Sequence, residues 1–158
     1  MPSEESLVAD HVMEFPGGYT RSLGPVIGRY LTGLRDGRFL GVRAADGRVI
    51  VPPTEYDPET GATLGADDGD FVEVGPEGRV ETWAWVPNPR GKHPLDRPFA
   101  WALIRLDGAS TALLHAVDAG DRAAMRTGMR VRPSWRAERT GQVLDVACFL
   151  PAEDGDAS

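Results

Sequence analysis

Cysteine, lysine and histidine are scarce in this sequence of 158 residues. Cys148 is the only cysteine, which excludes an internal disulfide framework and a zinc site built from several thiolates. The histidines are His11, His93 and His115, and none lies three or four residues from another. A helical pair of histidine metal ligands is therefore excluded as well.

Long apolar segments are also absent. No run approaches the ~20 apolar residues that a membrane-spanning helix needs. No charged and then apolar leader opens the sequence. We therefore expect no membrane span, no secretion and a cytoplasmic location.

The chain is acidic, with 24 Asp and Glu residues against 17 Lys and Arg residues and a formal net charge of −7. Nucleic-acid binders usually carry a basic face, because phosphate contacts supply most of their affinity, so this charge argues against that class. The hydrophobic content of 41% is that of an ordinary globular domain. The 19 glycines and 13 prolines favour turns and short strands over long helices.

One good helix is predicted at residues 22–37, after an N-terminal arm at residues 1–21. Ser22 is suited to the N-cap, Pro25 to the first turn and Gly37 to a left-handed C-cap. The apolar residues between them recur at i, i+3, i+4 and i+7. So short a helix is not stable alone, and we expect the rest of the protein to cover its apolar face.

A hairpin and an irregular connector are predicted at residues 38–69. Two strand-like runs flank Asp46-Gly47, which is a strong signal for a two-residue turn. Pro52-Pro53 ends the second run, because proline cannot donate to a strand ladder. The residues that follow are acidic and rich in turn signals, which is typical of a connector.

Six short strand-like runs follow within residues 70–150, and residues 151–158 are predicted to be a flexible tail. Alternation within the second run places Val80 on one side and both Trp83 and Trp85 on the other. The third run is almost wholly apolar, so we expect it to be buried on both faces. The predicted fold class is mainly β, with a five- to six-stranded OB-type barrel after the helix and hairpin. The runs are 71–74, 79–86, 99–106, 111–117, 129–136 and 142–149, with one helical turn inside 121–127.

No catalytic motif is found. The sequence has no phosphate loop of the form Gly-x-x-x-x-Gly-Lys-Ser/Thr, no Gly-x-Gly-x-x-Gly that opens a helix, and no Gly-x-Ser-x-Gly elbow. His115 lies in an apolar run, where a structural histidine is expected. Cys148 lies in Val-Ala-Cys-Phe, where a buried thiol behaves as a small hydrophobe. We therefore predict no catalytic residue.

The loop at residues 87–98 is the densest cationic segment of the acidic chain. It places Arg90, Lys92, His93 and Arg97 within eight residues. Arginine offers bidentate contacts to phosphate, so this loop is a candidate phosphate site. The alternative is that it is the solvated tip of a hairpin.

Two further rows of side chains are candidates for surface roles. Trp83, Trp85 and Trp101 lie on runs that are expected to pair, where they would cluster on one sheet face. Because tryptophan is enriched at interfaces, the cluster is either a partner surface or part of the barrel core. The second row consists of Arg130, Arg132 and Arg136 on one strand-like run. A charged row of this kind normally points to water or protects a sheet edge.

The order of these elements and several short motifs resemble a known family. The motifs are "LRDGRFLG", "DGRVIVPP", "GRVETWAWV", "PFAWALIRLDG" and "MRTGMRVRPSW". Together they are similar to the OB-fold acyl-CoA-associated proteins, in which a rubredoxin-like zinc ribbon is coupled to an OB barrel. The resemblance covers residues 22–150.

The resemblance also implies where a ribbon zinc would bind. The family's two cysteine pairs match Arg43 and Asp46, and then Asp57 and Thr60. These residues lack the Cys or His donors of a tetrahedral zinc site. We therefore expect no zinc, and a degenerate, metal-free ribbon held by its own hairpin and by Pro52-Pro53.

What the resemblance implies for function is a non-catalytic subunit. Such proteins accompany thiolase-like or lipid-transfer-protein-like enzymes, and the partner carries the reactive residues. The complex would act on an acyl-CoA, most specifically as a steroid side-chain-cleaving aldolase that performs a retro-aldol reaction on a CoA thioester. The cationic loop would then meet the CoA phosphates, and the tryptophans would meet the partner.

Two other functions compete with this interpretation. An OB barrel with aromatic side chains can stack single-stranded nucleic acid, although the net charge opposes it. A self-sufficient enzyme would have to use His115, His93 or Cys148.

Overall fold

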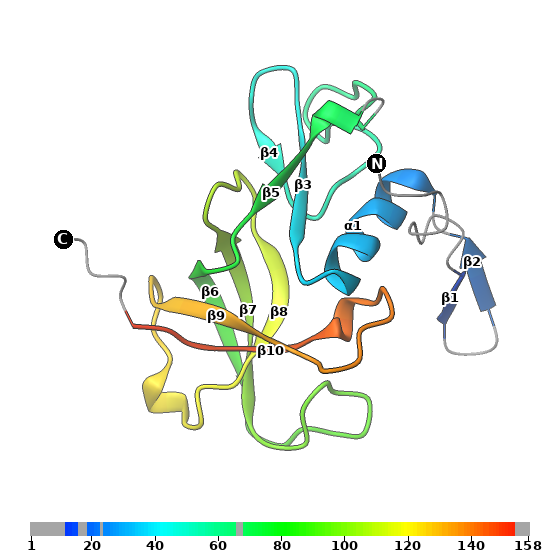
Figure 1. Cartoon of the computed structure of the whole chain (residues 1–158). Coiled ribbons are helices and arrows are strands. Elements are labelled where there is room, and N and C mark those ends of the chain that lie inside the picture. The colour runs from blue at the N-terminus through cyan, green and yellow to red at the C-terminus, as the bar shows by residue number, and fades with distance from the viewer. Residues whose placement is uncertain (1–11, 16–18, 23, 66–67, 154–158) are drawn as a thin grey trace.

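The computed structural model describes residues 12–15, 19–22, 24–65 and 68–153. They form a small hairpin, one α-helix, a three-stranded sheet and a closed five-stranded barrel (Figure 1). The mainly β fold class with an OB-type barrel is therefore confirmed. Within the described part of the chain, no helix is both long and apolar enough to cross a membrane.

The segment predicted as an N-terminal arm contains a hairpin. β1 (Val12–Phe15) pairs antiparallel with β2 (Tyr19–Ser22). Ser22 therefore ends a strand, and its predicted role as the helix N-cap is wrong. The prediction for residues 1–11 lies outside the described residues. The flexible tail was predicted from residue 151, but Pro151 belongs to the last strand and the Ala152 N–H donates to Arg130 O. Residues 154–158 of that tail lie outside the described residues.

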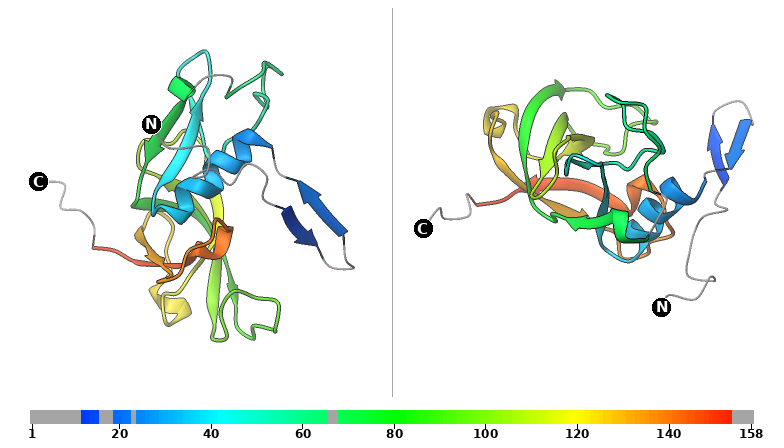
Figure 2. Two further views of the ribbon diagram at one scale, coloured as in Figure 1. Left: turned by 45° about the vertical axis from the view of Figure 1, so that its right-hand side comes forward. Right: turned by 90° about the horizontal axis from the view of Figure 1, so that it is seen from above.

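Helix α1 (Pro25–Arg35) begins three residues later than predicted, with Gly24 as its N-cap and Pro25 at its first position. Gly37 adopts φ +76° directly after the Asp36 C-cap, which confirms the predicted left-handed turn. The predicted apolar face is buried, and its central residue Leu31 is only 2% exposed. Figure 2 shows the helix lying against the sheet and the side of the barrel.

One loop, at residues 139–145, binds the helix at its C-terminal end. The Arg139 guanidinium donates to the carbonyl of Arg35 at 2.9 Å and to that of Arg136 at 3.0 Å. The buried Asp145 carboxylate accepts three backbone N–H groups at 2.7–3.1 Å, those of Thr140, Gly141 and Gln142. These bonds fix residues 139–145, so the cation that caps the helix is itself held by a folded loop.

The three-stranded sheet has β3 (Phe39–Arg43) between β4 (Val49–Ile50) and β5 (Phe71–Val74). The Asp46-Gly47 turn exists, but its loop has three residues: Ala44 N–H donates to Arg48 O, and Gly47 takes φ +92°. β5 was predicted among the barrel strands. It pairs instead with β3, because Gly75 and Pro76 break the chain before the barrel begins. A short 3-10 helix, η2 (Asp68–Asp70), precedes β5.

The barrel has the strand order β10-β8-β7-β6-β9 and is closed. Its pairs are antiparallel except β10 with β8, which run parallel. The strands are β6 (Gly78–Val86), β7 (Phe99–Leu106), β8 (Leu113–Val117), β9 (Arg130–Trp135) and β10 (Val146–Pro151). The 3-10 helices η3 (Arg122–Ala124) and η4 (Val143–Asp145) lie between them, the former at the predicted helical turn.

A β-bulge at Glu81 corrects the predicted sides of β6. Val80 pairs with Ile104, whereas Thr82 pairs with the next residue back, Leu103. The extra residue shifts the alternation by one position, so Val80 faces the core together with Trp83 and Trp85. Sequence alternation alone had placed Val80 on the opposite side.

The outer face of β7 is not fully covered, so its predicted burial on both faces is wrong. Phe99, Ala102 and Ile104 are buried, but Leu103 is 38% exposed and its cross-strand partner Leu114 is 60% exposed. A closed barrel has one interior, and its outer surface is buried only where a loop or helix packs on it.

Arg130 does not have the solvated role that was predicted for the arginine row of this strand. Its guanidinium donates to both carboxylate oxygens of Asp107, at 2.7 and 2.8 Å, and to Glu77 at 3.1 Å. The side chain is only 11% exposed, whereas Arg132 and Arg136 are exposed as predicted. Arg130 thus joins the start of β9 to the segments that flank β6 and β7 where the barrel closes.

We predict that Arg130→Met lowers the free energy of unfolding by about 1–2 kcal/mol at neutral pH, because two half-exposed carboxylates lose their donor. The Arg130 hydrogen bonds hold the pKa of Asp107 below its usual range. A lowered folded-state pKa stabilises the fold above the unfolded pKa of about 3.9, and this stabilisation is lost as pH falls through the folded value. Denaturant titrations should therefore show a wild-type advantage that shrinks below about pH 4.

Arg132→Met is the matched control on the same strand, and little change is expected there. An Arg130→Met protein whose deficit is the same at pH 7 and at pH 3 would show that Asp107 does not carry the effect.

Candidate functional site

The loop between β6 and β7 projects beyond one end of the barrel (Figure 1). It borders an open pocket of about 510 Å³, lined by Pro89, Arg90, Gly91, His93, Pro94, Leu95, Asp96 and Arg97. Leu95 anchors the loop, because it is buried against Phe99, Ala116 and Cys148 on the outer surface of the barrel. The pocket is thus formed by a loop with its own apolar attachment, which fixes where its cations stand.

The four predicted cations of this loop have different surroundings. Arg97 donates to the Asp118 carboxylate at 2.6 and 2.7 Å, so its charge is largely balanced. The His93 Nδ1 accepts the Arg90 backbone N–H at 2.8 Å, and its ring packs edge-on against Phe99 at 5.6 Å. His93 therefore shapes the loop.

Arg90 and Lys92 are both exposed; Arg90 lines the pocket, and Lys92 lies outside its lining in the same loop. Neither side chain makes a hydrogen bond or an ion pair with the described residues, which leaves both free to meet an anion. Of the four predicted residues of this loop, Arg90 and Lys92 therefore keep an unbalanced positive charge. Sequence reasoning missed Asp118 because it lies 21 residues from Arg97 along the chain.

The three tryptophans do not share a sheet face, and this correction follows from the strand register. Trp83 pairs with Ala102 and Trp85 with Ala100, whereas Trp101 pairs with Ala84. Residues directly opposite in a ladder point the same way, so Trp101 lies on the face opposite Trp83 and Trp85. The first two pack half-buried against the barrel core, and Trp101 packs against the cluster beneath the β6–β7 loop. Contact with a partner stays a prediction for all three.

His115 and Cys148 are enclosed by the fold. His115 is 5% exposed, its Nδ1 accepts the Ala116 N–H at 2.9 Å, and burial lowers its pKa. Cys148 is 3% exposed, and burial raises the pKa of its thiol. A buried neutral imidazole and a buried protonated thiol have the character of structural residues rather than of a base and a nucleophile.

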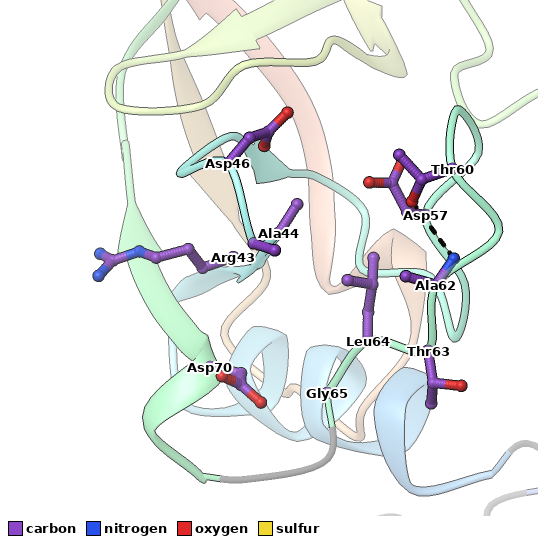
Figure 3. Close-up of a pocket in the computed structure, with 11 residues that line it drawn as sticks. Arg43, Ala44, Asp46, Asp57, Thr60, Ala62, Thr63, Leu64, Gly65 and Asp70 are labelled. Atoms are coloured by element: carbon purple, nitrogen blue, oxygen red, sulfur yellow. Dashed lines mark hydrogen bonds between the residues drawn. The ribbon is translucent and has the colours of Figure 1, made fainter.

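The four positions that the family resemblance gives to zinc ligands do lie around one pocket, of about 340 Å³ (Figure 3). They are Arg43, Asp46, Asp57 and Thr60. The donor chemistry does not fit zinc, because one residue is a cation and none offers sulfur or imidazole. Among the described residues, no three His, Cys, Asp or Glu side chains are grouped to hold a metal ion.

Together, these features define an OB-type barrel that carries a cationic loop and encloses His115 and Cys148. Residues 71–136 match the family model of the ChsH2 C-terminal OB-fold domain. A search of curated proteins found no match.

Solved structures share the fold, among them the following two. One is a protein of unknown function from the DUF35 family of Sulfolobus solfataricus, with 21% identity, a TM-score of 0.55, and coverage of 70% of this chain and 78% of that chain. The other is an Ltp2-ChsH2(DUF35) aldolase, with 20% identity, a TM-score of 0.56, and coverage of 78% of this chain and 91% of that chain. Residues 71–136 are thus similar to the ChsH2 OB-fold domain, and the two solved structures share the fold, in agreement with the OB-fold resemblance carried by the sequence motifs.

We predict that Cys148 resists alkylation in the folded protein. Its raised pKa and its burial keep the thiol protonated and out of reach, so iodoacetamide at neutral pH should label it at least about a hundredfold more slowly than in the urea-unfolded chain. Intact-protein mass spectrometry measures this directly, because the chain has a single cysteine. Rapid stoichiometric labelling of the native protein would show an accessible, activated thiol and reopen the case for a nucleophile.

Proposed function

We propose that this protein is a non-catalytic subunit that binds and supports a thiolase-like or lipid-transfer-protein-like acyl-CoA enzyme. The first candidate is an aldolase that cleaves a steroid side chain by a retro-aldol reaction on a CoA thioester. The observation that carries the proposal is the match of residues 71–136 to the ChsH2 OB-fold domain, together with the shared fold of the Ltp2-ChsH2 aldolase. The enclosed His115 and Cys148 agree with a partner that supplies the reacting groups.

Within such a complex, we assign the exposed cations of the β6–β7 loop to the CoA phosphates. Phosphate binding needs cations that are not already neutralised, and Arg90 and Lys92 meet that condition whereas Arg97 does not. Leu95 and His93 hold the loop in one shape, which reduces the entropy lost when an anion binds. Acyl-CoA is thus a ligand of the complex.

Single-stranded nucleic acid is the weaker candidate. Stacking needs exposed aromatic rings along a cationic groove. Here Trp83 and Trp85 face the core, and Arg97 and Arg130 are paired with carboxylates.

Co-expression tests the proposed function. The chain should co-purify in a fixed ratio with a thiolase-like protein encoded by the same genome, and cleavage of an acyl-CoA should require both proteins. A chain that stays a lone monomer beside every such protein, or that turns over an acyl-CoA by itself, would refute the proposal.

The loop has its own test within the reconstituted complex. Arg90→Ala combined with Lys92→Ala should weaken acyl-CoA binding by about tenfold, because two cations are lost. Calorimetric titration measures the affinity, and the melting temperature should not change because neither side chain has a hydrogen-bond or ion-pair partner among the residues that the structure describes.

Arg122→Ala combined with Arg132→Ala removes the same charge from exposed positions elsewhere and is the matched control. Equal affinities in the two double variants would mean that the β6–β7 loop is a solvated tip, even if the complex itself is real.

A further inference from the structure

Two turns of the chain, at residues 43–48 and 55–64, face each other across the pocket of Figure 3, and we call them the paired turns. Their backbones are folded independently of each other. In the first, Ala44 N–H donates to Arg48 O, and in the second, Leu64 N–H donates to Glu55 O, both at 2.8 Å. A small apolar cluster of Val42, Ala44, Ile50 and Leu64 lies between them. So small a cluster buries little apolar area, and the turns need a further link.

Arg48 supplies two such links and a third ion pair within its own turn. Its guanidinium donates to Asp46 at 2.7 Å within its own turn, and to Asp57 at 2.6 Å in the facing turn. Its third nitrogen lies 3.3 Å from the Glu59 carboxylate. The planar fork of arginine suits this arrangement, because each nitrogen points at a different carboxylate.

Asp57 is the acceptor that makes this linkage strong. Its side chain is only 4% exposed, whereas those of Asp46 and Glu59 are 55% and 72% exposed. A buried carboxylate is strongly destabilising when it is unpaired, while exposed ion pairs contribute little. The second oxygen of Asp57 accepts the Glu59 backbone N–H at 2.9 Å. Both of its oxygens are therefore occupied by donors from this chain.

We infer that the Arg48 guanidinium takes the place of a metal as the cross-link between the paired turns, so that this ribbon is held by ion pairs and needs no zinc. Asp46 and Asp57, two of the four positions expected for metal ligands, are bound to a cation that the chain itself provides. Arg43 is turned away from Asp57 in Figure 3 and takes no part. This inference does not depend on the proposed function.

The charged groups around the pocket give the linkage a pH dependence. They are Arg48, Asp46, Asp57 and Glu59, with Arg43 and Asp70 at the rim. Hydrogen bonding lowers the pKa of Asp46, chiefly from Arg48, and that of Asp57, chiefly from the Glu59 N–H and also from Arg48. The stabilisation is therefore complete above the unfolded pKa of about 3.9 and is lost as pH falls through the lowered values.

Hydrogen exchange followed by mass spectrometry on the full chain tests the inference. Arg48→Lys keeps the charge but loses the fork, so amides in residues 55–64 should exchange about tenfold or more faster, while those of β7 keep their wild-type rates. Arg43→Lys is the matched control in the same pocket and should exchange like the wild type. Raising NaCl from 0.05 to 1 M should also speed exchange in residues 55–64. The added salt shortens the Debye length and so weakens the ion pairs of Arg48.

A metal-held ribbon would behave differently. Faster exchange of residues 55–64 on adding a chelator to the wild type would overturn the inference, as would Arg48→Lys rates equal to those of Arg43→Lys. Equal acceleration in β7 and in residues 55–64 would also overturn it, because Arg48 would then support the whole fold rather than this link.

Discussion

One aromatic residue, Phe39, packs between the two parts of this fold. Phe39 of β3 packs against Trp135 of β9 at 5.1 Å and against Phe149 of β10 at 6.0 Å between ring centroids. Phe39 and Phe149 are fully buried, so the sheet, the helix that covers it and the barrel share a single core. Because neither part completes its apolar burial alone, the position of the sheet relative to the barrel is fixed by packing. The polar sites described above are attached to that common core.

Ion pairs then set what each charged residue is able to do. Arg97, Arg130 and Arg48 are each engaged by carboxylates that lie within hydrogen-bonding distance. Arg90 and Lys92 lack such acceptors among the described residues. Arg90 and Lys92 thus leave positive charge available at the β6–β7 loop, whereas these three arginines act as links within the fold. This division fits a protein that contributes surface and shape to a site whose reacting groups come from elsewhere.

Local patterns were enough to predict the helix and the strands of the sheet and of the OB-type barrel, because apolar periodicity and Gly-Pro punctuation act over short stretches of sequence. They missed the hairpin of β1 and β2. These patterns failed where one extra residue shifted the alternation of inward and outward side chains along a strand, as Glu81 does in β6. They also failed for contacts between distant segments. Arg130 with Asp107 and Arg97 with Asp118 are pairs whose partners lie more than 20 residues apart, and a charged residue gives no sign in the sequence of whether it will be paired. The prediction that the three tryptophans share one sheet face was wrong for the same reason, since it depended on a strand register that only the folded barrel defines.

The closure of the barrel has a consequence for how the chain folds during its synthesis. β10 is the last described strand, yet it supplies Phe149 to the centre of the core and bridges β8 with β9. During synthesis, the earlier strands are made while the cavity they enclose still lacks its final wall. Their apolar interior stays open to water until β10 emerges from the ribosome, and nascent chains with such exposed surface associate readily. A binding protein or chaperone that shields this opening in the interval would favour correct assembly over aggregation.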